Sequence, residues 1–150
     1  MPALFYHVTQ SPVEEVVASL LQRALGQGWR VELRGTDAAR MDWYDQRLWL
    51  GGDEAFLPHG LAGGPHDDLQ PVLLTTAPKP EGMQAIMALD GAEVSLDEIA
   101  QKERVWILFD GRDQQALERA RAQWRDLTGA GASAQYWSEK DGRWEKKAEK

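Results

Sequence analysis

Two arginines and a tryptophan in the C-terminal third of the chain have the spacing of a carboxylate-binding surface. Arg121 and Arg125 are four residues apart and Trp124 follows Arg121 by three, so the three side chains are neighbours if this segment is helical. Guanidinium groups bind carboxylates through paired hydrogen bonds, and an indole beside them adds apolar contact area. The pattern therefore favours binding of a peptide carboxylate or of acidic side chains. The alternative is a solvated basic face, with Arg121 paired to Glu118 or Asp126 and Trp124 buried.

A second aromatic pair lies in the middle of the chain. Trp49 precedes Phe56 by seven residues, and a turn at Gly51-Gly52 would let both rings border one apolar pocket. Gly51-Gly52 should also begin a long loop that continues through Pro58-His59-Gly60-Leu61-Ala62-Gly63, a composition that suits a shaped surface better than bond cleavage. The alternative is that both rings belong to the hydrophobic core.

Sites for metals, phosphates and nucleophilic catalysis have little support. His59, His66, Asp67 and Asp68 offer some zinc ligands, but the chain has no cysteine and no histidine pair at helical spacing. The segment 8–12, after the first expected strand, contains no glycine, and no G-x-x-x-x-G-K-(S/T) motif occurs. None of the serines lies in a G-x-S-x-G elbow. We therefore expect no catalytic residue, no metal and no cofactor.

Composition and charge indicate a soluble globular protein. The 150 residues suit a single domain over 1–150, and a hydrophobic content of 43% is enough for a core. The chain has neither an apolar run of about 18 residues nor a signal-peptide start, so we expect a cytoplasmic protein without membrane contact. The net charge of −7 argues against direct binding of nucleic acid, because such proteins normally present a basic face.

The charges are unevenly distributed along the chain. Residues 37–98 include twelve acidic and three basic residues, whereas residues 99–150 include nine acidic and eleven basic ones. The C-terminal third can therefore present a local cationic surface to an acidic segment of a partner.

The apolar pattern predicts strands alternating with helices. Short apolar runs predict strands over 3–8, 29–33, 70–76, 85–89 and 104–109, and a terminal hairpin over 134–137 and 142–146. Spacings of three and four predict helices over about 12–25, 37–48 and 113–127, and a helical turn over 96–100. Capping boxes are expected at Ser11 with Glu14 and at Ser95 with Glu98, and either Asp110 or Asp113 should cap the last helix.

This order of elements predicts an α/β fold of three α/β/α layers. The sheet should be open and mainly parallel, with the first strand in a central position, because crossovers through helices join parallel strands. The C-terminal β-hairpin should follow the last helix, and residues 146–150 should form a frayed tail.

The chain resembles a known family in the segment around the second aromatic pair. Leu48-Trp49 followed by Ala55-Phe56-Leu57-Pro58-His59-Gly60-Leu61-Ala62-Gly63 is similar to the signature L-W-x-x-x-x-x-(S/A)-F-(V/L)-P-H-x-L-A-G. That signature is typical of the chi subunit of bacterial DNA polymerase III, an accessory subunit of the clamp loader. The opening Phe5-Tyr6, the Trp29-Arg30-Val31 strand and the final helix extend the resemblance over nearly the whole chain.

The resemblance implies a mononucleotide-binding-like topology and a non-catalytic adaptor. Members of this family bind the acidic C-terminal tail of single-stranded DNA-binding protein, which ends in Pro-Phe, and join the psi subunit of the clamp loader. The positions associated with the tail match Arg121, Trp124, Arg125, Trp49 and Phe56.

Two positions depart from the family pattern, and two rival functions stay open. Trp124 stands where some relatives have tyrosine, and Leu117 replaces a basic residue one turn earlier. One rival is a nucleotide-dependent or hydrolytic enzyme on an α/β scaffold. The other is a direct nucleic-acid binder that stacks bases on its seven tryptophans, which the acidic charge disfavours.

Overall fold

A computed structural model of the chain describes residues 2–49, 58–140 and 143–150. Its strands are β1 (Ala3–Val8), β2 (Val31–Arg34), β3 (His59–Leu61), β4 (Val72–Thr75), β5 (Ala85–Ala88), β6 (Arg104–Asp110), β7 (Ala134–Lys140) and β8 (Arg143–Glu149). Its helices are α1 (Val13–Gly26), α2 (Ala38–Trp49), α3 (Leu96–Gln101) and α4 (Gln114–Gly129), with a 3-10 turn η2 (Asp67–Leu69).

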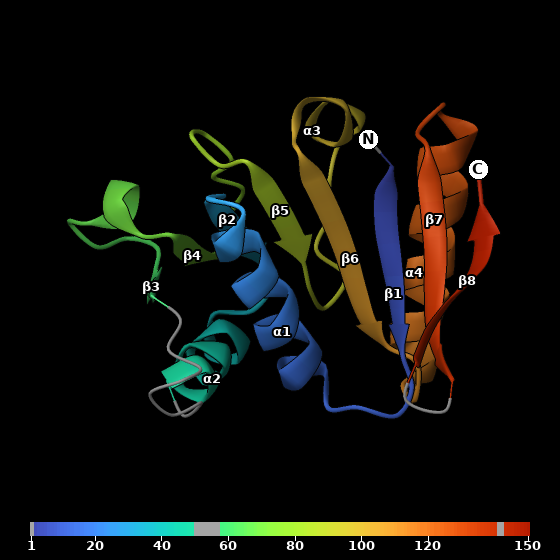
Figure 1. Ribbon diagram of the computed structural model, residues 1–150, viewed down its shortest axis with the longest axis horizontal. Coiled ribbons are helices and arrows are strands. Elements are labelled where there is room, and N and C mark those ends of the chain that lie inside the picture. Colours follow the sequence, from blue (N-terminus) through green and yellow to red (C-terminus); the bar gives the residue numbers. More distant parts are fainter. Residues whose placement is uncertain (1, 50–57, 141–142) are drawn as a thin grey trace.

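The strands within the described residues form one sheet in the order β3-β4-β2-β5-β6-β1-β7-β8 (Figure 1). Neighbouring strands are parallel throughout, except that β8 runs antiparallel to β7. β1 lies in the interior of the sheet between β6 and β7. The predicted open parallel sheet with a C-terminal hairpin is therefore confirmed.

The helices cover the two faces of this sheet and make three layers. α1 and α2 pack on one face and α3 and α4 on the other, as Figure 1 shows. Successive strand residues point to opposite faces, so Leu4 packs under α1 while Phe5 packs under α4. The sheet is thus buried on both sides, which explains its nearly continuous apolar strands. No helix in the described part of the chain is long and apolar enough to cross a membrane.

Two of the predicted helix caps are confirmed and one is wrong. Ser95 and Glu98 form the capping box of α3, and Asp113 accepts hydrogen bonds from the first turn of α4. The box predicted at Ser11 does not form, because Pro12 occupies the cap position of α1 without a side-chain hydrogen bond. The Ser11 hydroxyl instead donates to Glu139 on β7 at 2.6 Å.

Glu139 latches the C-terminal hairpin to the loop between β1 and α1. Its Oε1 accepts the backbone N–H groups of Thr9, Gln10 and Ser11 at 3.0, 3.0 and 3.1 Å. The residue is buried, so the loop donors and the carboxylate satisfy one another away from water. Burial raises the pKa of Glu139, but the hydrogen bonds from Ser11, Gln10 and Thr9 outweigh it and lower the pKa overall.

Substitution of Glu139 by alanine is expected to cost about 2 kcal/mol of unfolding free energy at neutral pH, because the loop donors lose a charged acceptor. Because the pKa of Glu139 is lower in the folded than in the unfolded protein, the ionised carboxylate stabilises the fold at pH values above the unfolded pKa of about 4.3. This stabilisation is lost as the pH falls through the folded-state pKa. The difference between wild type and variant should therefore shrink as the pH drops below that value. Urea denaturation across pH measures it, with the exposed neighbour Glu145→Ala as control. Equal losses for both variants would show that the latch contributes nothing.

Two further expectations about the chain require correction. The signature segment was expected to be a long loop, but His59–Leu61 forms β3, which pairs with β4 at the sheet edge. Residues 146–150 were expected to fray, but β8 runs to Glu149, and the Lys150 amide donates to the Ala134 carbonyl at 2.8 Å. Pairing with β7 satisfies this backbone, and the Trp144 ring anchors the strand on Tyr6 with centroids 4.9 Å apart.

A buried ion cluster ties β2 to α3. Arg34 donates to both carboxylate oxygens of Glu32 at 3.1 and 2.7 Å and to those of Glu98 at 2.9 and 2.7 Å. Thr75 and the backbone of Lys79 complete the hydrogen bonding of Glu32 at 2.7 and 2.9 Å. Burial opposes the charge of Arg34, yet the carboxylates of Glu98 and Glu32 raise its pKa overall. The cluster is fully satisfied, which is the condition for burying charge in a core.

Candidate functional site

The cationic stripe predicted on the last helix borders an apolar cavity. Arg121, Trp124 and Arg125 on α4 line a cavity of about 370 Å³ together with Tyr136 of β7 and Ala148 of β8. Asp113 caps α4, and the helix that begins there turns its small and apolar residues toward the sheet. Both arginines therefore stand on the exposed side of the helix, while Trp124 is half-buried between them and the sheet.

Aromatic packing holds Trp124 in a defined position. Its ring meets Phe5 of β1 edge-on with centroids 5.2 Å apart, and meets Tyr136 in the same way at 5.9 Å. Edge-to-face contacts of this kind are favourable for aromatic pairs. The indole is thus a rigid wall of the cavity. Because it is already ordered, binding of a ligand costs no further conformational entropy of this side chain.

His7 supports the floor of the cavity from β1. Its Nδ1 lies 3.1 Å from the Tyr136 hydroxyl, and its ring stacks on Phe109 with centroids 5.1 Å apart. Burial and the nearby Arg121 guanidinium hold the pKa of His7 below its usual value. Burial also raises the pKa of Tyr136, which the charge of Arg121 opposes. The guanidinium of Arg121 therefore acts on both rings.

The two arginines beside the cavity have no acidic partner among the described residues. The sequence left open that Arg121 pairs with Glu118 or Asp126, but no such ion pair forms in the described part of the chain. Glu118 accepts instead from Gln114 on its own helix at 3.2 Å. Two guanidinium groups beside an apolar hollow suit a ligand that combines carboxylates with an apolar group.

The structure does not bring Trp49 to this cavity. Trp49 ends α2, on the opposite face of the sheet from α4, and its ring lies 4.1 Å from that of His59 between centroids. β3, which contains His59, and the cavity strand β7 lie near opposite edges of the sheet. Trp49 is 48% exposed, so it belongs to a separate surface rather than to the core. Phe56 lies outside the described residues.

His59 and Asp67, considered as metal ligands, have structural contacts instead. His59 is buried and its Nε2 lies 2.9 Å from the Asp45 carbonyl and 3.2 Å from its carboxylate. Asp67 accepts the backbone N–H groups of Gly63 and Gly64 at 2.9 and 3.0 Å and pairs with Lys79 at 2.8 Å. The described residues hold no cluster of three or more possible metal ligands.

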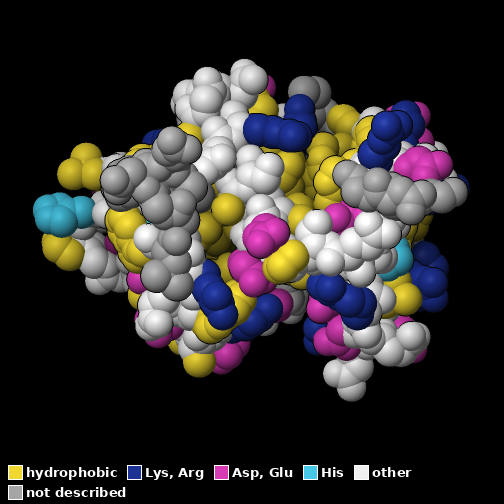
Figure 2. All heavy atoms as spheres, turned by 60° about the horizontal axis from the view of Figure 1, so that its bottom comes forward, with side chains coloured by type: hydrophobic (Ala, Val, Ile, Leu, Met, Phe, Trp, Pro, Cys, Tyr) yellow, Lys and Arg dark blue, Asp and Glu magenta, His cyan; other side chains and the backbone are white. Residues whose placement is uncertain are grey.

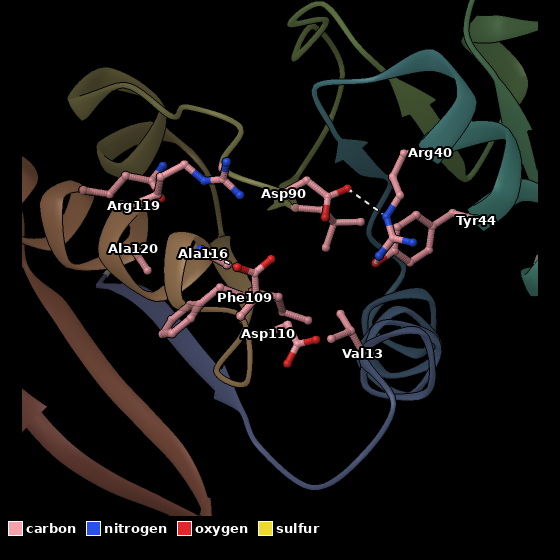
Figure 3. Close-up of a pocket in the computed structure, with 14 residues that line it drawn as sticks. Val13, Arg40, Tyr44, Asp90, Phe109, Asp110, Ala116, Arg119 and Ala120 are labelled. Atoms are coloured by element: carbon pink, nitrogen blue, oxygen red, sulfur yellow. Dashed lines mark hydrogen bonds and ion pairs between the residues drawn. The ribbon is translucent and has the colours of Figure 1, made fainter.

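A second, smaller cavity lies at the carboxyl ends of β5 and β6, the place where open α/β sheets commonly bind ligands. It measures about 110 Å³ and lies between α4 and the beginnings of α1 and α2 (Figure 3). Asp90, Asp110 and Asp113 line it, and Arg40 is held by Asp90 at 3.3 Å. Arg119 also lines the cavity, so three carboxylates face two guanidinium groups, and the volume is below the usual range of about 300–1,000 Å³ for ligand pockets.

The face that contains these strand ends has mixed charge. Figure 2 shows Lys and Arg side chains interspersed with Asp and Glu around a hollow lined by apolar groups. The described surface seen in this view therefore differs from the basic stripe that a nucleic-acid binder presents.

Three residues of the candidate site could not be predicted from the sequence. Tyr136 and Ala148 line the cavity and His7 supports it, but Tyr136 lies seven residues beyond the end of α4, and Ala148 and His7 are farther from it along the chain. The only local signal is the alternation of the terminal hairpin, which predicts strands but not the helix they face. Their proximity to α4 follows from the position of β7 beside β1.

Comparison with known proteins identifies the family of the chain. A search of the curated proteins finds no match to the chain. The family described as DNA polymerase III chi subunit, HolC, matches residues 1–135. That match covers strands β1 to β6, the described helices and the arginines of α4, and it ends near the start of β7. The chain therefore belongs to the DNA polymerase III chi subunit family, a family of accessory subunits in DNA replication.

Proposed function

We propose that this chain is a non-catalytic adaptor that binds the acidic C-terminal tail of single-stranded DNA-binding protein and couples it to the clamp loader of DNA polymerase III. One observation carries the proposal. Arg121 and Arg125 lack acidic partners among the described residues and flank a cavity walled by Trp124 and Tyr136.

The chemistry of this site matches a peptide that is acidic and ends in an aromatic residue. The cavity of about 370 Å³ lies within the usual range of about 300–1,000 Å³ for ligand pockets and accepts an apolar side chain. The guanidinium groups of Arg121 and Arg125 then bind the terminal carboxylate or acidic side chains. Trp124 has no hydroxyl, so the hydroxyl hydrogen bond of a tyrosine is lost and the indole contributes its apolar contact area.

The strength of attachment depends on the number of tails available as well as on the affinity for each tail. Both arginines are exposed, and exposed charge pairs contribute modestly in water. Many tails presented on one DNA strand raise the effective concentration of the ligand at the adaptor. A moderate affinity for each tail therefore allows stable yet exchangeable attachment. The partnership with a psi subunit rests on family resemblance alone.

The alternative, a nucleotide-dependent or hydrolytic enzyme, is disfavoured by the small volume of the strand-end cavity and by the missing phosphate-binding motif. A single set of titrations separates the candidates. A labelled acidic peptide ending in Pro-Phe, a nucleoside triphosphate and a single-stranded oligonucleotide are each added to the pure protein. We expect saturable binding of the peptide only, measured by fluorescence anisotropy and calorimetry. Saturation by the nucleotide or oligonucleotide while the peptide is ignored would overturn the proposal.

A further inference from the structure

The C-terminal strand β8 contributes to the candidate site although it lies outside the family match. The match ends at residue 135, whereas Tyr136 and Ala148 are two of the five residues that line the cavity. The hairpin pairing sets these two side by side, because Tyr136 is the partner of Ala148 in the β7–β8 register. Side chains of directly opposed residues share one face of a sheet, so both stand toward α4.

The position of β8 is fixed from the other face of the hairpin. Trp144 packs on Tyr6, and Glu139 on the adjoining strand is latched to the β1–α1 loop. A bulge between Tyr136 and Trp137 shifts the register, and Gln135 pairs with Glu149 beyond it. The strand is thus held at both ends of its pairing, and Ala148 stands at a defined place on the rim of the cavity.

The charge of β8 complements an acidic ligand. Residues 143–150 hold four basic and two acidic side chains, in a chain whose net charge is −7. Two of these lysines pair with the acids, Lys147 with Glu145 at 3.3 Å and Lys146 with Glu149 at 3.4 Å. The remaining cations, Arg143 and Lys150, have no acidic partner within the described residues. β8 therefore adds a net positive charge to the side of the cavity that faces α4, although Ala148 is its residue in the lining.

We infer that β8 is the second wall of the tail-binding site and that Ala148 sets the width of the cavity for the apolar end of the acidic peptide. This inference rests on the proposed function and extends it to a segment beyond the family match. The apolar end enters between Trp124 and Tyr136 on one side and Ala148 on the other. The acidic part of the peptide then lies along the arginines of α4, and the net positive charge of β8 adds a longer-range attraction. A larger or acidic side chain at position 148 interferes with this arrangement.

Substitutions at position 148 test the inference by size and by charge. Ala148→Phe fills the rim, and an exposed strand position accepts phenylalanine without loss of the fold. We expect at least a tenfold loss of affinity for the labelled acidic peptide, and no loss for the small variant Ala148→Ser. Ala148→Glu should also lose affinity, and added salt should reduce its deficit relative to wild type, because screening acts on charge but not on size. Thermal melts confirm that each variant is folded.

Arg121→Ala, measured in parallel, distinguishes a failure of the inference about β8 from a failure of the proposed function. If Arg121→Ala loses the peptide while Ala148→Phe and Ala148→Glu, both folded, bind it like wild type, the inference about β8 is wrong and the proposed function stands. If wild type ignores the peptide, the proposed function fails and the inference fails with it. Loss of binding by Ala148→Phe but not by Ala148→Ser supports β8 as a wall of the site.

Discussion

Arg121→Ala is expected to weaken binding of the acidic tail peptide about ten- to a hundred-fold. A charge-assisted hydrogen bond between a guanidinium and a carboxylate contributes about 1.5–3 kcal/mol, which corresponds to that range of affinity. Arg121 has no acidic partner among the described residues, so its substitution breaks no ion pair of the described fold. Its exposed place on α4 means that folding stability should change little.

Arg119 provides a matched control on the same helix. It is exposed like Arg121, but it lines the strand-end cavity, and Figure 3 shows its guanidinium extending toward the loop of Asp90. Arg119→Ala removes the same charge from the protein without touching the candidate site. We therefore expect it to bind the peptide nearly as well as wild type, with any difference arising from long-range charge alone.

The measurement is fluorescence anisotropy with the labelled peptide, at several salt concentrations. Added salt should weaken wild type more than Arg121→Ala, since the variant has already lost part of the electrostatic attraction. If Arg121→Ala and Arg119→Ala lose the same affinity, net charge rather than the cavity determines binding. If Arg121→Ala melts like wild type and binds equally well, the site does not lie on this face of α4.

Arg34→Met should destabilise the fold by about 3–5 kcal/mol, because it leaves buried carboxylates without their counter-charge. The side chain of Glu32 is fully buried and that of Arg34 is 3% exposed, so water cannot replace the lost partner easily. Methionine has a similar shape to the arginine stem, so the loss of stability should arise from the missing charge rather than from an empty cavity. Urea denaturation measures the change in unfolding free energy.

A surface pair and a second substitution serve as controls for this result. Arg112 pairs with Asp110 at 2.8 Å, but both side chains are more than 40% exposed, and Arg112→Met should cost less than about 1 kcal/mol. In the Arg34→Met background, Glu32→Gln should recover part of the lost stability by removing the unpaired charge. Failure of Glu32→Gln to recover any stability would assign the loss to packing rather than to electrostatics.

The fold could be predicted where local patterns determine it. The apolar stripe of α4, the Asp113 cap and the Ser95–Glu98 box depend on residues within about one turn of one another, and the structure confirms each of them. β3 was missed because its three residues lack the length and alternation of a strand and are ordered only by pairing with β4. The Ser11 cap failed because a side chain 128 residues away accepts its hydroxyl.

Part of the candidate site could likewise be predicted from the sequence, and part could not. Arg121, Trp124 and Arg125 could be placed on one helix face from their spacing, since helical geometry brings residues three and four apart together. Their spacing does not show that Tyr136 and Ala148 complete the cavity, that its arginines stay unpaired within the described residues, or that Trp49 belongs to the opposite face of the sheet. Those outcomes depend on the order of strands in the sheet. The strand order depends on how much apolar surface is buried on both faces of the whole sheet, and the spacing of residues along the chain does not predict it.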